Sequence, residues 1–185
     1  MTEAVHELYR SHWGKPSRRA RFKVGEFDIE VDKWEAKSNP EGVNLYATIG
    51  ASARPLPRQD LKHRLEFFLG LTPAQDEVAS PLAALGLYSA RQGEGLDHGH
   101  TAPSDGPLWS GSRMRTFLVV RARPDFLPAL ELSDKLHVEF LQAIPIFESE
   151  RRFKIRHGVE ALLRRWEEGG VAFWDAGRSA EPSLS

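Results

Sequence analysis

The stretch Leu136–Asp175, LHVEFLQAIPIFESERRFKIRHGVEALLRRWEEGGVAFWD, decides the fold that the sequence predicts. Apolar and polar residues alternate in its first letters, LHVEF, which is the period-two pattern of a strand. Pro145 has no N–H to donate, so it is predicted to limit pairing at the end of this strand. The stretch therefore begins with a buried strand that exits at a proline.

Two helices separated by a glycine are predicted next. Glu148 and Glu150 fall in the first turn of the first helix, where carboxylates suit the positive end of the helix dipole. Gly158 is placed to close that helix in the left-handed conformation. The second helix ends at the glycine pair 169–170, and 171–174 is predicted to be a short strand that joins an existing sheet. The apolar stripe of the second helix is Val159, Leu162, Leu163 and Trp166.

The beginning of the chain predicts a helix over 3–13 and then a β-hairpin. Gly25-Glu26 suits a two-residue type II′ turn, in which glycine takes the first position. The resulting register places three basic residues opposite three acidic ones, and this charged face is predicted to be solvated. The opposed pairs are Lys23 with Asp28, Arg21 with Glu30 and Arg19 with Asp32.

Further strands and one more helix are predicted between the hairpin and the closing stretch. The helix runs from a capping box at 72–75 to about Gln92, and Pro81 either kinks it or restarts it. The last of these strands is largely apolar, which predicts a central place in the sheet. The strands are 43–49, 61–69 and 116–121, and the loops are 92–111 and 123–134.

Together these elements predict an α+β domain with a mixed β-sheet flanked by helices. The length of 185 residues is enough for one domain with a sizeable core. We expect an N-terminal helix and linker at 1–18, a single α+β domain at 19–178 and a tail at 179–185.

Composition excludes several classes of function. The net charge of −1 gives no general attraction to nucleic acid or to an acidic membrane. Without cysteine, the chain has no disulfide, no catalytic thiolate and no zinc site with cysteine ligands. No apolar run of about 18 residues occurs, and Glu3 and Glu7 lie where a signal peptide would be apolar. The expected location is therefore the cytoplasm.

The loop 92–111 contains the one cluster with metal-ligand chemistry. His98 and His100, with Asp97 or Asp105, offer two imidazoles and a carboxylate to a divalent ion. The competing interpretation is that these side chains stabilise the loop by hydrogen bonds, and it is favoured because the composition is that of a loop rather than of ligand-bearing strands. We therefore predict no metal, no cofactor and no catalytic residue.

Other chemical motifs are incomplete or absent. His137-Val138-Glu139 matches the H-x-E half of a zinc deaminase, but the P-C-x-x-C half requires cysteine. The G-x-S-x-G, P-loop and G-x-G-x-x-G patterns do not occur. The basic residues within 151–165 are followed and interrupted by glutamates, which indicates a solvated helical surface rather than a phosphate-binding face.

Short motifs spread over 27–178 resemble the suppressor of fused family and occur in the family's order. Phe140–Ile146 resembles its F-L-Q/L-x-P-I segment. Asp97-His98 resembles the G-D-H loop of animal members, although Leu96 stands where those members have glycine. The other matching segments are Ala47–Ser52, Leu65–Phe67, Pro81–Tyr88, Gly158–Leu163 and Trp174–Arg178.

The resemblance implies an α+β domain, a mixed sheet flanked by helices, without enzymatic activity. Animal members have a second domain and bind a short extended peptide of a transcription factor between the two. Bacterial single-domain members are regarded as immunity proteins that neutralise toxins. With 185 residues we expect no second domain, so only Asp97 and His98 map onto the loop beside the peptide clamp.

Two hypotheses from different classes follow. The first is a non-enzymatic binding protein, an immunity protein or a regulator, that takes a protein partner along a strand edge and loop 92–111. Its predicted contact residues are Asp97, His98, His100 and Trp109. The alternative is a metal-dependent enzyme that uses Asp97, His98, His100 and Asp105.

Overall fold

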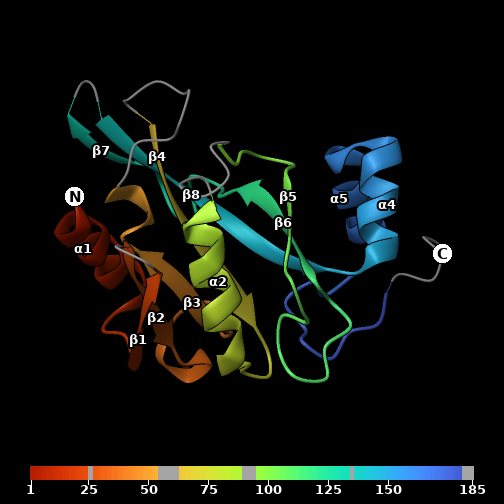
Figure 1. The fold of residues 1–185 in the computed structure, drawn as a ribbon, viewed down its shortest axis with the longest axis horizontal. Helices are drawn as coiled ribbons and strands as arrows, with labels where there is room; N and C mark the ends of the chain where they lie inside the picture. The colour runs from red at the N-terminus through yellow and green to blue at the C-terminus, as the bar shows by residue number, and fades with distance from the viewer. Residues whose placement is uncertain (25–26, 54–62, 89–94, 134–135, 181–185) are drawn as a thin grey trace.

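A mixed β-sheet organises the computed structural model, which describes residues 1–24, 27–53, 63–88, 95–133 and 136–180 (Figure 1). In these ranges eight strands form one sheet in the order β1-β2-β3-β4-β8-β6-β5, and β7 pairs with β8. β4 and β8 are parallel and the other pairs are antiparallel, which confirms the predicted α+β class. The strands are β1 (Arg18–Val24), β2 (Phe27–Trp34), β3 (Asn44–Ile49), β4 (His63–Leu71), β5 (Thr101–Pro103), β6 (Thr116–Arg121), β7 (Leu130–Ser133) and β8 (Leu136–Ile146). The helices are α1 (Thr2–Trp13), α2 (Ala79–Gly86), α4 (Glu148–His157) and α5 (Val159–Glu168), with 3-10 helices η1 (Ala36–Ser38), η2 (Ala51–Ala53) and η3 (Asp76–Val78).

Helices cover both faces of this sheet (Figure 1). α2 lies on one face, where its Leu82 and Leu85 join the core with alternate residues of β4 and β6. The other face is covered by α1 over β2 and β3, and by α5 over β6 and the end of β8. Trp13 of α1 and Trp166 of α5 are the largest side chains that these two helices bury. None of the helices in the described ranges has the length and apolar character that crossing a bilayer requires.

β8 is the central strand, and it is longer than the predicted strand. It extends over 11 residues through Pro145 to Ile146, and it pairs with β4, β6 and β7. β4 pairs with β8 only as far as Gln142, whereas β6 continues alongside it to Ile146. Pro145 therefore lies where β8 has a neighbour on one side only, a position that tolerates a missing N–H. The prediction that Pro145 limits strand pairing was wrong on the β6 side of β8, where pairing continues past Pro145 to Ile146.

The hairpin of β1 and β2 has the predicted register, with Arg19 opposite Asp32 and Arg21 opposite Glu30. The turn at 25–26 lies outside the described residues. The prediction of a solvated charged face holds for Arg21 but is wrong for Asp32, which is 1% exposed. The reason is α1, which packs on that face and brings His6 within 3.7 Å of Asp32. Arg19 compensates the buried carboxylate with two hydrogen bonds, of 2.6 and 2.9 Å.

The predicted helix over 73–92 begins later than the sequence indicates. Thr72 is part of a bridge in which its N–H donates to Trp174 O and its C=O accepts from Ala176 N, so it does not cap a helix. α2 begins at Ala79 instead, and Pro81 lies in its first turn, where a backbone N–H has no partner within the helix. The alternative in which a helix restarts at Pro81 was therefore nearly right, since α2 begins two residues earlier. The predicted end of the helix at Gln92 lies outside the described residues.

Three segments were assigned the wrong secondary structure. The loops 92–111 and 123–134 contain the short strands β5 and β7, which are too brief for a period-two pattern to reveal. The closing segment 171–174 forms no strand, and the isolated bridge to Thr72 is made by the next residue, Asp175. The two helices before it are as predicted, except that Gly158 has φ 88° and ψ 165° rather than the left-handed helical conformation.

Candidate functional site

The predicted loop residues Asp97–His100 form a tight turn. His100 N donates to Asp97 O over 3.0 Å, and Gly99 at the third position has φ 83°, as a type II turn requires. The Asp97 carboxylate accepts a hydrogen bond from His98 N at 2.6 Å, and His100 Nδ1 accepts one from Asp97 N at 3.2 Å. The short polar side chains thus stabilise the turn, which is the interpretation preferred from the sequence.

This turn is fixed to β6 and α5. His98 Nδ1 accepts a hydrogen bond from Arg121 N at 3.2 Å, so its Nε2 carries the proton and donates to Glu160 Oε1 at 3.0 Å. Gly99 lies against Val159, because a Cβ at Gly99 would come within 3.0 Å of that side chain. The turn is therefore held in place by both elements rather than projecting freely.

Arg121 links the turn to a second set of polar residues. Its guanidinium donates to Asp97 Oδ1 at 2.8 Å and to Glu139 Oε2 at 3.2 Å. Glu139 Oε2 lies 3.4 Å from His63 Nε2, and His63 Nδ1 lies 2.7 Å from His137 Nε2. We call these six residues the polar row, which consists of Asp97, His98, Arg121, Glu139, His63 and His137.

Sequence reasoning found only part of the polar row. His63 and His137 are 74 positions apart and become neighbours because β4 and β8 pair in parallel. His137 and Glu139 were noticed only as half of a deaminase motif, and nothing in the sequence linked them to His63 or Arg121. The usable signal was the alternation itself, which puts His63 in a row with Leu65 and Phe67 and puts His137 in a row with Glu139 and Leu141.

The remaining predicted residues lie apart from this row. Trp109 is 5% exposed and belongs to the core cluster that also contains Leu82 and Leu85 of α2. His100 is exposed, and Asp105 lies beyond the far end of β5. In the described part of the chain, the group of three ligating side chains that lies close together is His63, His137 and Glu139, rather than the loop set. The contact roles of Asp97, His98, His100 and Trp109 stay predictions.

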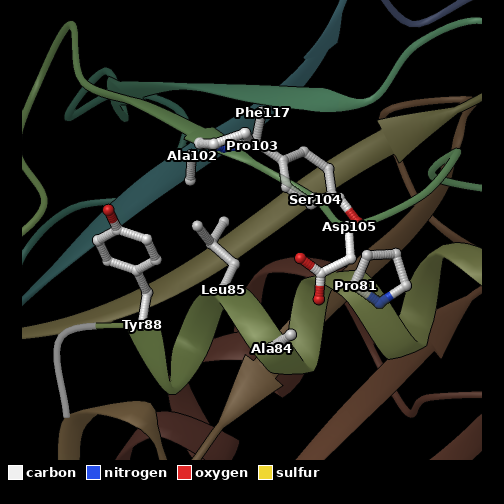
Figure 2. Close-up of a pocket in the computed structure, with 9 residues that line it drawn as sticks. All are labelled: Pro81, Ala84, Leu85, Tyr88, Ala102, Pro103, Ser104, Asp105 and Phe117. Atoms are coloured by element: carbon white, nitrogen blue, oxygen red, sulfur yellow. The ribbon is translucent and has the colours of Figure 1, made fainter. Parts of the chain in front are cut away.

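A pocket of about 150 Å³ separates α2 from β5 and β6 (Figure 2). We call it the α2–β5 pocket. Figure 2 shows the Tyr88 ring at one end and the Asp105 carboxylate directed towards α2 at the other. Its floor is apolar, since the buried Leu85, Ala102 and Phe117 line it. The other lining residues are Pro81, Ala84, Pro103 and Ser104.

β5 forms the edge of the sheet beside this pocket. Val119 N donates to His100 O, and Ser104 N donates to Arg115 O, so His100, Ala102 and Ser104 are the positions that bond to β6. The alternation of an antiparallel ladder then turns the backbone groups of Thr101 and Pro103 away from the sheet. The edge therefore presents the N–H and C=O of Thr101 and the C=O of Pro103 to a neighbouring chain.

The opposite edge, β1, is protected by charge. Basic residues occupy several positions on it, which is a common defence against edge-to-edge pairing. Next to it, Lys33 Nζ lies 2.7 Å from Asp76 and 3.1 Å from Glu35, and Tyr46 donates to Asp76 at 2.9 Å. The hydrogen bond from Lys33 holds the pKa of Asp76 below its usual value. The charged groups beside β1 are already paired with one another, and the basic residues on β1 oppose pairing with a further strand. β5 is therefore the edge better suited to a partner.

Changes in the turn should have little effect on stability. In Asp97→Ala and His98→Ala we expect the free energy of unfolding to fall by no more than about 1 kcal/mol, because the lost ion pairs are largely exposed. Urea denaturation of both variants measures this. Gly99→Ala is the informative contrast, with an expected loss of about 1–3 kcal/mol, since alanine is strained at φ 83° and meets Val159. Equal losses in all three variants would contradict this description of the turn.

Comparisons with known proteins agree with this geometry. The profile of the family described as Suppressor of fused protein (SUFU) matches residues 27–179. A crystal structure of a SUFU homologue from Neisseria gonorrhoeae FA 1090 is 21% identical, with a TM-score of 0.74, and the match covers 97% of this chain and 95% of that one. No curated protein sequence matches significantly.

Two further solved structures share the fold. The Sufu-Fu complex crystal structure contains a chain that is 16% identical, with a TM-score of 0.68, and the match covers 97% of this chain and 89% of that one. Drosophila Suppressor of Fused is also 16% identical with a TM-score of 0.68, and the match covers 97% of this chain but 50% of that protein. The chain thus corresponds to about half of the Drosophila protein.

Proposed function

Because this chain belongs to the suppressor of fused family, we propose that it is a non-enzymatic protein-binding domain that takes an extended segment of a protein partner along β5. A relative of the same fold has been crystallised as a Sufu-Fu complex, which supports a protein as the class of ligand. The α2–β5 pocket beside an open strand edge is the observation that carries the proposal.

The shape and chemistry of the edge indicate which segment fits. A partner strand beside β5 forms main-chain hydrogen bonds with Thr101 and with the C=O of Pro103, and Pro103 keeps this pairing short because it donates none. Affinity must then come from a side chain, and the apolar floor at Leu85 and Phe117 accepts an aliphatic or aromatic one. Asp105 at the end of the pocket favours a basic residue next to it in the partner.

The turn extends this surface beyond the first residue of β5. Thr101 follows the turn directly, so a partner strand that continues past it reaches the exposed His100 and the half-buried Asp97 and His98. We assign these three residues to specificity. Trp109 contributes from the core, where it packs with the residues that support the pocket floor.

The identity of the partner rests on the family resemblance. We assign this chain to the immunity proteins, which bind a toxin in the cytoplasm, and a regulatory protein is the other partner of the same class. A toxin and a regulatory protein would both have to fit the apolar floor and the acidic end of the α2–β5 pocket. One set of pocket variants therefore tests both partners. The single domain at 19–178 with a separate tail remains part of this proposal.

Ala84→Arg should weaken the complex without unfolding the protein. Ala84 is exposed on α2 and lines the pocket, so a long cation there fills the space that the partner side chain needs. Partners are captured from the native cell, expressed in pure form and titrated against the protein by calorimetry. We expect the dissociation constant to rise at least tenfold, which corresponds to about 1.4 kcal/mol.

Ala129→Arg is the matched control, because Ala129 is also exposed and lies outside the pocket lining. Its affinity should equal that of the unchanged protein. If Ala84→Arg and Ala129→Arg bind the purified partner equally well, the pocket is not the binding site and the proposal is wrong.

A further inference from the structure

We propose that His63, His137 and Glu139 bind one divalent transition-metal ion, for which Zn²⁺ is the best match. The site lies on the β8 side of the polar row, and metal binding there is a property separate from protein binding. The three residues offer one ligand atom each, and these atoms all lie within 4.8 Å of one another. Two imidazoles and a carboxylate are a donor set that zinc accepts.

The geometry of the two rings favours a shared ion. His63 Nδ1 and His137 Nε2 point at each other across 2.7 Å. In a tetrahedral site with metal–nitrogen distances of 2.0–2.1 Å, ligand atoms are about 3.3 Å apart. The rings therefore need to separate by only about half an ångström to admit an ion. Glu139 Oε2 lies 3.4 Å from Nε2, the second ring nitrogen of His63. A histidine offers one nitrogen to an ion, so this carboxylate has to turn towards His63 Nδ1 and His137 Nε2 to join them.

The backbone holds these ligands in place. The parallel register pairs His63 directly with His137, and Glu139 follows two residues later on the same face of β8. The site lies where the core-facing side of the sheet turns polar, since Leu65 and Leu141 continue the same rows as buried residues. The side chains of His63 and Glu139 are 25% and 20% exposed, so an ion can reach the site without unfolding the sheet.

Surrounding charges also suit a cation. Arg121 donates to Glu139, which orients this carboxylate as a hydrogen-bonding neighbour of a metal ligand does. Its positive charge is shared with Asp97, and Glu131 lies opposite His137 on β7. With both imidazoles neutral, the facing groups Glu139, Asp97, Glu131 and Arg121 sum to a negative charge. Three protein ligands leave a fourth position open, which water or Glu131 fills.

Metal titration of the tag-free protein, first treated with EDTA, tests the inference. With Zn²⁺ in calorimetry and with Co²⁺ in visible absorption, we expect one ion per chain and the strong absorption of a tetrahedral cobalt centre. His137→Ala should weaken binding at least 100-fold, and Glu139→Gln, which keeps the shape of the side chain, at least tenfold. His157→Ala, in which an exposed histidine of α4 is removed, should leave binding unchanged.

Several results would overturn the proposal. One is no saturable binding of Zn²⁺ or Co²⁺ to the folded wild-type protein, which would leave His63, His137 and Glu139 as a hydrogen-bonded chain. Another is binding that survives His137→Ala but is lost in His98→Ala/His100→Ala, which would place the ion in the turn. If His137→Ala does not fold by circular dichroism, His63→Ala carries the test with the same expected loss. Ala84→Arg should bind metal normally, so this result is independent of the partner complex.

Discussion

Arg178→Ala is expected to lower the free energy of unfolding by about 3–5 kcal/mol, because it leaves a buried carboxylate without its cation. Arg178 forms two hydrogen bonds with Glu150, at 2.5 and 2.8 Å, in a pair whose side chains are 5% and 0% exposed. Its guanidinium also donates to Pro145 O at 2.9 Å and lies over the rings of Phe147 and Trp166. The side chain of Arg178 thus connects the segment after α5 to β8, α4 and α5 itself.

Urea denaturation measures this loss. Arg152→Ala is the matched control, because Arg152 pairs with Glu148 on the exposed face of α4, the helix that carries Glu150. Its expected cost is below about 1 kcal/mol. A loss in Arg178→Ala as small as that in Arg152→Ala would show that the closing segment does not stabilise the sheet, contrary to the buried geometry.

Glu66→Ala is the second change with a large expected effect. Glu66 is fully buried and accepts four hydrogen bonds, from Gly50 N, Ser52 N, Ser52 Oγ and Thr48 Oγ1, at 2.6–3.0 Å. Alanine removes the acceptor of all four and leaves a cavity beside β3. We expect a loss of about 3–5 kcal/mol in the free energy of unfolding, measured in urea at neutral pH.

Glu66→Gln should be tolerated far better than Glu66→Ala. Its carbonyl oxygen can accept from Gly50 and Ser52 as Oε1 does, and its amide can donate to Thr48 Oγ1, whose hydroxyl then donates to Phe67 O. We expect a change of no more than about 1.5 kcal/mol. Equal destabilisation by glutamine and alanine would contradict this arrangement of hydrogen bonds around Glu66.

Glu66 also predicts a pH dependence. Burial raises the pKa of its carboxyl, although the hydrogen bonds from Thr48, Ser52 and Gly50 oppose this effect. A raised pKa means that the folded protein binds this proton more tightly than the unfolded chain does. The associated stability is complete below the ordinary glutamate pKa of about 4.3 and is lost as the pH rises through the folded pKa. Stability curves of the wild type and Glu66→Gln should therefore diverge in favour of glutamine as the pH rises from about 4 to 8.

Local patterns predicted the elements whose signal lies within one segment. The register of Arg19 with Asp32 followed from alternation and one turn, and α5 followed from a single apolar stripe that buries Leu162 and Trp166. Errors occurred where a distant segment takes over the backbone. Thr72 bonds Trp174 and Ala176 rather than capping a helix, and β6 pairs with β8 past Pro145. Such long-range pairing leaves no trace in a window of ten residues.

The candidate site shows the same division. Asp97 and His98 were singled out for their metal-ligand chemistry and for their resemblance to a family loop, and the structure places both in a turn. His63 and Glu139 were not joined to them, because only the parallel pairing of β4 with β8 and the reach of Arg121 bring these residues together. Trp109 was predicted as a contact residue, and in the structure it is 5% exposed within the core cluster that contains Leu108 and Met114.

Amide hydrogen exchange of the purified protein with and without its partner tests the central claim most directly. Thr101 has the outward-facing N–H on β5, so its exchange should slow in the complex, together with exchange in the part of α2 that lines the pocket. Exchange on β1 and α4 should not change. Slower exchange confined to β1 or α4, with Thr101 unaffected, would show that the partner binds elsewhere and that β5 is not the binding edge.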